Sequence, residues 1–209
     1  MNGRRLRLQM FRPARPASPG RHLVMSALQC AGLSAAFLVT APLMVRRLED
    51  RLGLPRPSGR IGAAARAAGS GLLLASTTLN MASAATMAVQ GDGTPLPLDT
   101  ARRLVIRGPY RWVRNPMAIG GIGQGVAVGL LLRSPLVVAY ALAGAVLWQG
   151  AFRPSEEQDL LERFGAPYAA YREQVRCWIP RRTPVEPLGP TGATGAVSAR
   201  RRGGRAPRR

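Results

Sequence analysis

Residues 117–152 read MAIGGIGQGVAVGLLLRSPLVVAYALAGAVLWQGAF, which is two uncharged runs of 16 and 18 residues separated by Arg133 and Ser134. A helix rises ~1.5 Å per residue and a bilayer core is ~30 Å thick, so each run comes close to the length of a membrane span. A break of two residues between two apolar runs predicts a tight helical hairpin. Gly121, Gly125 and Gly129 recur at four-residue intervals and predict a smooth stripe where another helix packs closely.

Two further uncharged runs precede this hairpin, at residues 23–45 and 67–90. The first has 23 residues and predicts a membrane span. The second is rich in Ala, Ser, Thr and Gly, which favours a helix that faces protein more than lipid. The fold expected is therefore an all-α membrane protein with about four transmembrane helices, a C-terminal helical hairpin and short cytoplasmic helices.

Charge is segregated along the chain. The 209 residues include 30 basic residues, all of them Arg, against 10 acidic ones, which gives a net charge of +20. Basic flanks around long uncharged runs argue against a soluble single-core domain. We divide the chain into a disordered basic arm (1–21), two transmembrane helices (22–90), a core of loop, hairpin and cytoplasmic helices (91–182), and a disordered Arg-rich tail (183–209).

The arginines also suggest an orientation. Four spans place the basic arm, the 91–116 loop and the segment after the hairpin on one side, which the positive-inside rule makes cytoplasmic. The connector 46–60 then lies on the other side with five Arg, in conflict with the rule. A chain with Arg but no Lys, rich in Ala, Gly and Pro, suggests a GC-rich bacterial genome, so we expect a protein of the bacterial inner membrane with its active site facing the cytoplasm.

Local signals predict the ends of the helices around the hairpin. Pro116 suits the first turn of the helix that it opens. Ser155 followed by Gln158 matches a capping box and predicts that a separate helix starts there. Gly165 ends that helix, and Pro167 opens a second short one.

Several chemistries are excluded by composition. His22 is the one histidine, and the two cysteines, Cys30 and Cys177, lie in unlike segments. Imidazole metal clusters, Ser-His-Asp triads and a disulfide framework are therefore not expected, and we predict no metal site. Chemistry must depend on carboxylates, Arg, Tyr, Asn and a bound cofactor.

Two segments around the hairpin resemble a known family. They are RGPYRWVRNPMAIGG (107–121) and EEQDLLERFGAPYAAYREQVRCWIPR (156–181), and GDGTPLPLDTARRLV (91–105) precedes them. Together they resemble the integral-membrane methyltransferases related to isoprenylcysteine carboxyl methyltransferase and phospholipid (phosphatidylethanolamine) methyltransferase, in their bacterial branch. The resemblance covers roughly residues 90–182. The family's Arg-His-Pro-x-Tyr pattern is matched at Arg114 and Pro116, whereas Asn115 and Ala118 stand at its His and Tyr positions.

This resemblance implies methyl transfer from S-adenosylmethionine to a lipophilic acceptor whose carboxylate, amine or thiol is methylated. Catalysis of such a displacement is mainly alignment and charge stabilisation, for which we expect Arg114 and Asn115. The predicted cofactor-binding residues, with the catalytic pair among them, are Tyr110, Arg111, Arg114, Asn115, Pro116, Glu156, Glu157, Tyr168 and Tyr171.

Each type of residue in this set has a role that fits the cofactor. Arg114 or Arg111 can clamp its carboxylate, and Glu156 or Glu157 can accept hydrogen bonds from its amine or ribose. The tyrosines Tyr110, Tyr168 and Tyr171 can face the adenine or the sulfonium. Simpler roles stay open, because glutamates cap helices, tyrosines anchor at membrane interfaces and arginines bind phosphate headgroups.

Two other functions compete with methyl transfer. Membrane sterol-type reductases, which use NADPH, have a similar C-terminal end, but the Arg-Asn-Pro-Met segment before the hairpin favours a methyltransferase. A non-enzymatic membrane protein could instead bind anionic lipid through its Arg patches. The partners expected are a lipophilic or lipidated acceptor and anionic membrane lipids, with no specific nucleic acid.

Overall fold

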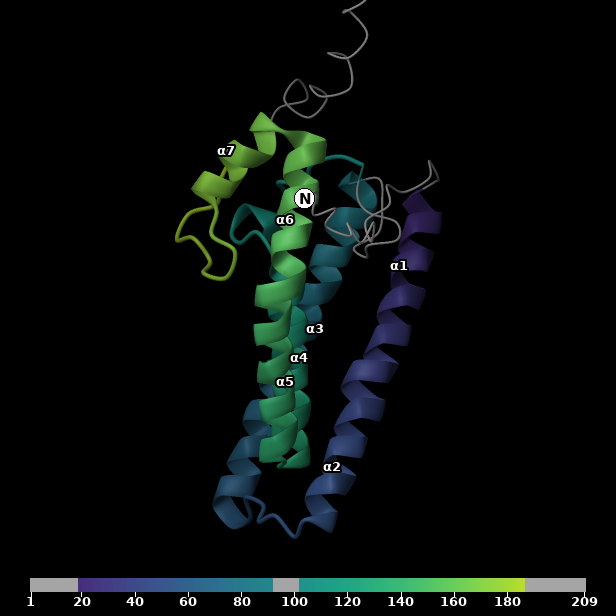
Figure 1. Ribbon diagram of the computed structural model, residues 1–209, viewed down its shortest axis with the longest axis vertical. Coiled ribbons are helices and arrows are strands. Elements are labelled where there is room, and N and C mark those ends of the chain that lie inside the picture. Colours follow the sequence, from purple (N-terminus) through teal and green to yellow (C-terminus); the bar gives the residue numbers. More distant parts are fainter. Residues whose placement is uncertain (1–18, 92–101, 187–209) are drawn as a thin grey trace, which may run out of the picture.

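The computed structural model describes residues 19–91 and 102–186, and all regular secondary structure in these ranges is helical (Figure 1). The elements in chain order are α1 (Pro19–Ser34), the π-helical turn η1 (Ala35–Thr40), α2 (Ala41–Arg51), α3 (Gly59–Gln90), the 3-10 turn η3 (Gly108–Arg111), α4 (Pro116–Leu132), α5 (Pro135–Leu147), the π-helical turn η4 (Trp148–Phe152), α6 (Arg153–Phe164) and α7 (Ala166–Gln174). Most of the predicted arm, the tail and residues 92–101 of the loop lie outside the described residues.

Three helices are long and apolar enough to cross a membrane: Ala27–Arg51, Gly59–Gln90 and Pro135–Phe164. The apolar helix Pro116–Leu132 is shorter, with 17 residues. The expected all-α membrane fold is thus confirmed, with one of its four apolar helices shorter than the rest. In the helix Pro135–Phe164 the uncharged run is 135–152, and we take only this part as the membrane-crossing segment; the charged α6 continues beyond it.

The predicted hairpin is formed by α4 and α5. Arg133 takes the left-handed conformation, with φ at +53°, and this turns the chain between the two helices. The hydroxyl of Ser134 then accepts a hydrogen bond from the Val137 N–H at 3.1 Å and caps the start of α5. A short polar break thus ends one apolar helix and begins the next.

The glycine stripe on α4 is only partly as predicted. A Cβ added at Gly125 or Gly129 would meet α5 at 2.9 Å or less, so these two glycines do allow close packing. Gly121 has nothing within 4 Å, and its predicted packing role is wrong. Gly120 and Gly123 instead face Asn80 and Ser76 of α3. One helical turn has about 3.6 residues, so residues four apart do not lie directly above one another. Successive glycines of this repeat therefore turn gradually around the helix axis and face different neighbours.

The second uncharged run faces protein on one side only, so the expectation from its composition is met in part, and large side chains such as Leu74 and Met81 are exposed on the other side. It lies in α3, whose buried positions are small residues, namely Gly62, Gly69, Ser76, Ser83 and Ala88. Amide groups join α3 to α4, because Asn80 Nδ2 donates to Gln124 Oε1 at 2.9 Å and Gln124 Nε2 donates to Thr77 Oγ1 at 3.0 Å. Small residues with polar side chains between them are the usual contact of helices inside a membrane.

The connector 46–60 is shorter than predicted, because α2 continues to Arg51 and α3 already begins at Gly59. The glutamate Glu49, 1% exposed, accepts a hydrogen bond from the Leu136 N–H at 3.0 Å, at the start of α5. The arginines near it also have partners: Arg46 donates to the Leu132 carbonyl, and Arg56 pairs with Asp50. Part of the positive charge that conflicts with the positive-inside rule is therefore compensated within the protein.

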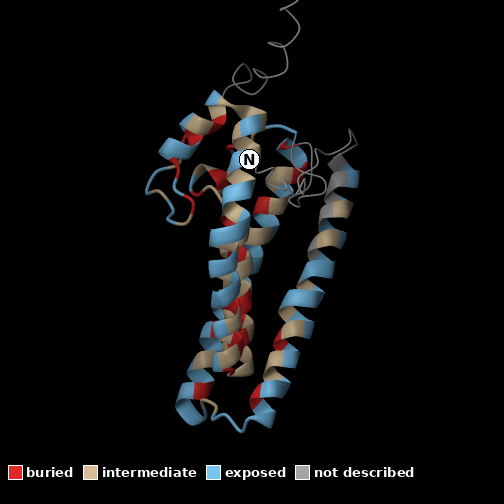
Figure 2. Ribbon diagram, in the orientation of Figure 1, coloured by how far each residue is buried: buried red, intermediate tan, exposed pale blue. Residues whose placement is uncertain are grey.

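The other end of the bundle gathers the segments with the predicted site residues. The long helices run in alternating directions, so the end of α3, the start of α4, and α6 and α7 all lie at one end (Figure 1). Buried residues concentrate where α3, α4 and α5 pack and again beneath α7, whereas α1 is exposed along most of its length (Figure 2).

Candidate active site

The loop before α4 is held in place by the chain that follows α7. Three backbone hydrogen bonds join the two segments: Arg114 N–H to Arg176 O at 3.0 Å, Arg181 N–H to Trp112 O at 2.9 Å, and Val185 N–H to Arg111 O at 3.1 Å. These bonds hold residues more than 60 positions apart next to one another. They therefore fix the position of the loop backbone, from which the side chains of the loop extend.

A small hydrophobic core lies beneath this pair of segments. Its buried members are Ile106, Tyr168, Tyr171, Val175 and Val185. Because Val185 is 7% exposed, the folded core extends beyond the predicted boundary at residue 182. Residues 183–186 are therefore not part of a disordered tail, a correction that their Pro-rich local composition did not reveal.

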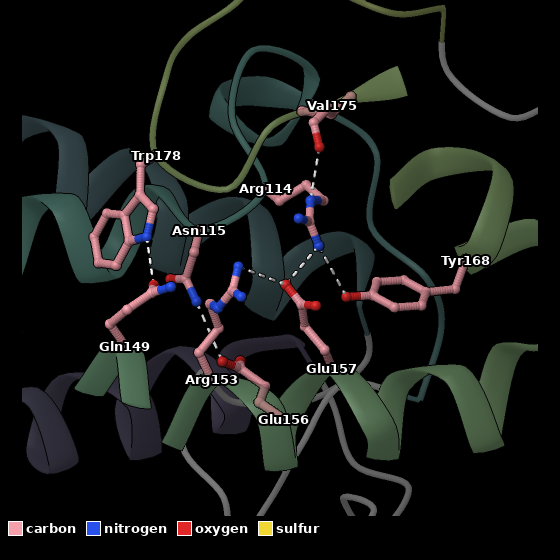
Figure 3. Close-up of polar contacts among 9 residues, drawn as sticks. All are labelled: Arg114, Asn115, Gln149, Arg153, Glu156, Glu157, Tyr168, Val175 and Trp178. Atoms are coloured by element: carbon pink, nitrogen blue, oxygen red, sulfur yellow. Dashed lines mark hydrogen bonds and ion pairs between the residues drawn. The ribbon is translucent and has the colours of Figure 1, made fainter. Parts of the chain in front are cut away.

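Arg114 connects three elements (Figure 3). Its Nε donates to the Val175 carbonyl at 2.6 Å, and its Nη1 donates to Glu157 Oε1 at 2.7 Å and lies 3.5 Å from the Tyr168 hydroxyl. The side chain is only 12% exposed, so these charged hydrogen bonds lie largely out of water. Its Nη2 makes no hydrogen bond to a described residue.

The neighbouring glutamates Glu156 and Glu157 have different partners. Glu157 accepts from Arg114 and also lies 3.5 Å from Arg153 Nη1, so two guanidinium groups share its charge. Glu156 Oε2 accepts from Asn115 Nδ2 at 3.2 Å and, among the described residues, forms no ion pair within 4 Å. Burial, together with the carboxylates of Glu157 and Asp159, raises the pKa of Glu156 to about 7, although its bond from Asn115 opposes this.

Asn115 ends the loop and caps α4. Its Oδ1 accepts from the Ala118 N–H at 3.0 Å, and Pro116 occupies the first turn, as its sequence position predicts. Since the cap fixes Oδ1 on the helix, Nδ2 must point toward Glu156. The same amide therefore starts the helix and orients a carboxylate of α6.

The predicted helix start at Ser155 is wrong. The segments α5, η4 and α6 form one continuous helix, and the Ser155 hydroxyl donates to the Ala151 carbonyl at 3.3 Å instead of capping. The local capping signal is overridden because the backbone hydrogen bonds of the preceding span continue through it. Gly165, with φ at +58°, does end α6 as predicted, and α7 follows at once.

The three tyrosines predicted for the cofactor are buried, with 7% exposure at Tyr110, 2% at Tyr168 and 5% at Tyr171. They are not anchors at a membrane interface. The Tyr171 hydroxyl donates to the Tyr110 carbonyl at 2.7 Å, so it helps to hold the loop. Burial and the nearby Glu157 raise the pKa of Tyr168 to about 12, although Arg114 opposes this shift, and its hydroxyl therefore stays neutral beside Arg114.

The structure brings six of the nine predicted residues into one cluster, which we call the loop–α6 cluster: Arg114, Asn115, Pro116, Glu156, Glu157 and Tyr168. Tyr171 lies in the small core, and Tyr110 is buried beside it. Arg111 has a different partner, since its Nε donates to the Val185 carbonyl at 2.7 Å.

Sequence reasoning missed four residues of this region. Arg153 pairs with Glu157 four residues later, and that i, i+4 spacing is a signal we could have used. Trp178 Nε1 donates to Gln149 Oε1 at 2.6 Å, and its ring packs edge-on against Trp148. No sequence signal connects residues that are so far apart. In residues 19–91 and 102–186 no three His, Cys, Asp or Glu side chains are placed to hold a metal ion.

Comparison with known proteins agrees with this arrangement. Residues 64–166 match the family model of phospholipid methyltransferase. A stretch of 78 residues is 35% identical to a protein-S-isoprenylcysteine O-methyltransferase of Tribolium castaneum. That alignment covers 37% of this chain and 27% of the relative, so the chain spans only about a quarter of the relative's length. The helices α3 to α6 and the loop–α6 cluster fall mostly within the matched range, and this part of the chain is similar to the membrane methyltransferases related to phospholipid and isoprenylcysteine methyltransferases.

Proposed function

We propose that this protein transfers a methyl group from S-adenosylmethionine to a lipophilic acceptor at the membrane. The observation that carries the proposal is the loop–α6 cluster, which lies directly at the end of the apolar hairpin. A polar, charged cluster at the end of an apolar hairpin suits a reaction between a water-soluble donor and a lipid-embedded acceptor.

The residues present fit the chemistry of the cofactor. Its carboxylate needs a cation, and Arg114 Nη2 has no partner among the described residues. Because Nε and Nη1 are already bound to Val175 and Glu157, Arg114 would bind this carboxylate through Nη2 rather than through its whole fork. The positive end of α4 at Asn115 and Pro116 would add to the attraction for an anion.

The two glutamates of the cluster differ in the partners that their carboxylates have. Within residues 19–91 and 102–186, Glu156 forms no ion pair within 4 Å, whereas the charge of Glu157 is shared by Arg114 and Arg153. Tyr168 would lie at the edge of the site through its contact with Arg114. Tyr110, Tyr171 and Arg111 would support the loop from behind, by the backbone contacts described above.

When bound, S-adenosylmethionine supplies a methyl group on a positively charged sulfur. The protein's own contribution would be alignment, because a displacement at carbon needs the attacking and leaving atoms in line. The bonds from Asn115 to both α4 and α6 would keep the two walls of the site at a fixed separation. Arginines in the arm and loop support a cytoplasmic orientation in a bacterial inner membrane and contacts to anionic lipids.

The first test is ligand binding by the full-length protein in detergent. We expect S-adenosylhomocysteine to bind and to raise the temperature of unfolding, and NADPH to do neither. Stabilisation by NADPH alone would refute the methyltransferase and favour the reductase. Transfer of a radioactive methyl group into a lipid extract of the host membrane would then identify the acceptor.

A further inference from the structure

The two adjacent glutamates of α6 are not equivalent. Glu157 has Arg114 at 2.7 Å and Arg153 at 3.5 Å, so its charge is neutralised. Glu156 has one neutral partner, the amide of Asn115 at 3.2 Å, and its Oε1 makes no hydrogen bond to a described residue. Glu157 therefore holds the cluster together through two arginines, whereas Glu156 has one oxygen, Oε1, without a hydrogen bond to a described residue.

The available carboxylate is also held in a fixed position. Asn115 cannot rotate its amide without losing the cap on α4, because Oδ1 accepts from the Ala118 N–H. Nδ2 therefore keeps Glu156 Oε2 in place, while Oε1 makes no hydrogen bond to a described residue. Asn115 stands at the start of α4 and Glu156 lies in the first turn of α6, next to the uncharged runs of the hairpin; Figure 3 shows the two side chains facing each other. The polar group of a lipid-embedded molecule would arrive at this level.

We propose that Glu156 accepts a proton from the methyl acceptor, with Asn115 as its positioning residue, and that the acceptor's nucleophile is therefore one that carries a proton, an amine or a thiol, rather than a carboxylate. The inference rests on the proposed methyltransferase function. A carboxylate nucleophile is already ionised at neutral pH and needs no base, whereas an ammonium or a thiol must first lose a proton.

With an amine as the acceptor, a proton transfer to Glu156 precedes the displacement at the methyl carbon. An ammonium N–H gives its proton to Glu156 Oε1, and the carboxylate becomes a neutral acid. The freed nitrogen lone pair forms a bond to the methyl carbon, while the carbon–sulfur bond breaks and its electron pair stays on sulfur. The products are a methylated ammonium and a neutral thioether, and Glu156 returns its proton to water. A thiol follows the same sequence and yields a neutral thioether in place of the ammonium.

The charged and titratable groups around Glu156 suit this role. On α6 it faces Glu157, Asp159 and Arg163, and from other elements it faces the amide of Asn115 and, at longer range, the hydroxyls of Tyr110 and Tyr168. The nearby carboxylates favour the protonated form, and Arg163 favours the ionised one. Transfer of a proton is most efficient when the base has a pKa near the working pH, as Glu156 has.

The test compares full-length wild type, Glu156→Gln and a matched control, Glu162→Gln, in detergent. Glu162 lies on the same helix, is exposed and is hydrogen-bonded to Gln158, so its replacement removes the same charge away from the cluster. Three readouts are needed: affinity for S-adenosylhomocysteine by calorimetry, the pH profile of methyl transfer to dodecylamine and to dodecanoate, and the infrared C=O stretch of a protonated carboxyl.

We expect Glu156→Gln to bind S-adenosylhomocysteine within about twofold of wild type and to methylate dodecylamine roughly 100- to 10,000-fold more slowly. In Glu156→Gln the rate of methyl transfer should no longer fall as the pH drops below about 7. The infrared C=O stretch that titrates near this pH should also be absent. Glu162→Gln should retain the fall in rate and the stretch. A tenfold loss of S-adenosylhomocysteine affinity in Glu156→Gln would make Glu156 a cofactor ligand and overturn the inference. Methylation of dodecanoate by wild type as fast as that of dodecylamine, or a carboxyl stretch that still titrates near pH 7 in Glu156→Gln, would overturn it too.

These outcomes are distinct from failure of the proposed function. If wild type binds no S-adenosylhomocysteine, the methyltransferase proposal itself fails, and with it the inference. If wild type and all variants bind it equally but the infrared stretch does not depend on Glu156, only the role of Glu156 is refuted.

Discussion

Removal of residues 183–186 should destabilise the site end of the bundle, although the local sequence there resembles a tail. Val185 is 7% exposed, and burial of a valine side chain contributes roughly 1.5–3 kcal/mol. Two hydrogen bonds with Arg111, at 3.1 and 2.7 Å, add roughly 0.5–1.5 kcal/mol each. A chain that ends at Arg182 should therefore lose roughly 2.5–6 kcal/mol of unfolding free energy relative to one that ends at Glu186.

Denaturant unfolding of both truncated chains in the same detergent measures this difference, because they differ only in the four residues in question. The chain ending at Arg182 should also bind S-adenosylhomocysteine more weakly, since Arg111 belongs to the loop that carries Arg114. Equal stability and equal affinity of the two chains would show that Val185 does not hold the loop and would refute the reasoning.

Two further predictions concern single side chains. Arg114→Lys keeps the charge but cannot reach both Glu157 and the Val175 carbonyl, so affinity for S-adenosylhomocysteine should fall on the order of tenfold in a calorimetric titration; unchanged affinity would remove Arg114 from the site. Gly129→Ala should lower the unfolding temperature, because its Cβ would meet backbone atoms of α5 at 2.8 Å, whereas Gly121→Ala, with open space around it, should leave that temperature the same or higher.

The helices themselves could be predicted from the sequence. Uncharged runs bounded by Arg and Pro, the two-residue break at Arg133 and Ser134, and the stop at Gly165 are all local signals, and the structure confirms them. Local signals failed where a longer-range constraint was stronger. The capping pattern at Ser155 has no effect because the helix of the preceding span runs through it.

The candidate site was predicted as a set of residues but not as an arrangement. Sequence analysis placed Arg114, Asn115, Glu156 and Glu157 in one site through a resemblance, without deciding which of them pair. Glu157 binds Arg114 and Glu156 binds Asn115 because of the face that α6 turns toward the loop. Helix rotation and packing set that face.

What the sequence by itself determined is the set of apolar helices, because hydrophobic length and turn chemistry act over a few neighbouring residues. What only the tertiary structure decided is how distant polar segments meet. Val185 returns to Arg111, Glu49 reaches the start of α5, and Arg114 lies between Val175 and Glu157. These contacts join residues 43 to 87 positions apart. No local pattern encodes them, since they form only when the packed helices bring their ends together.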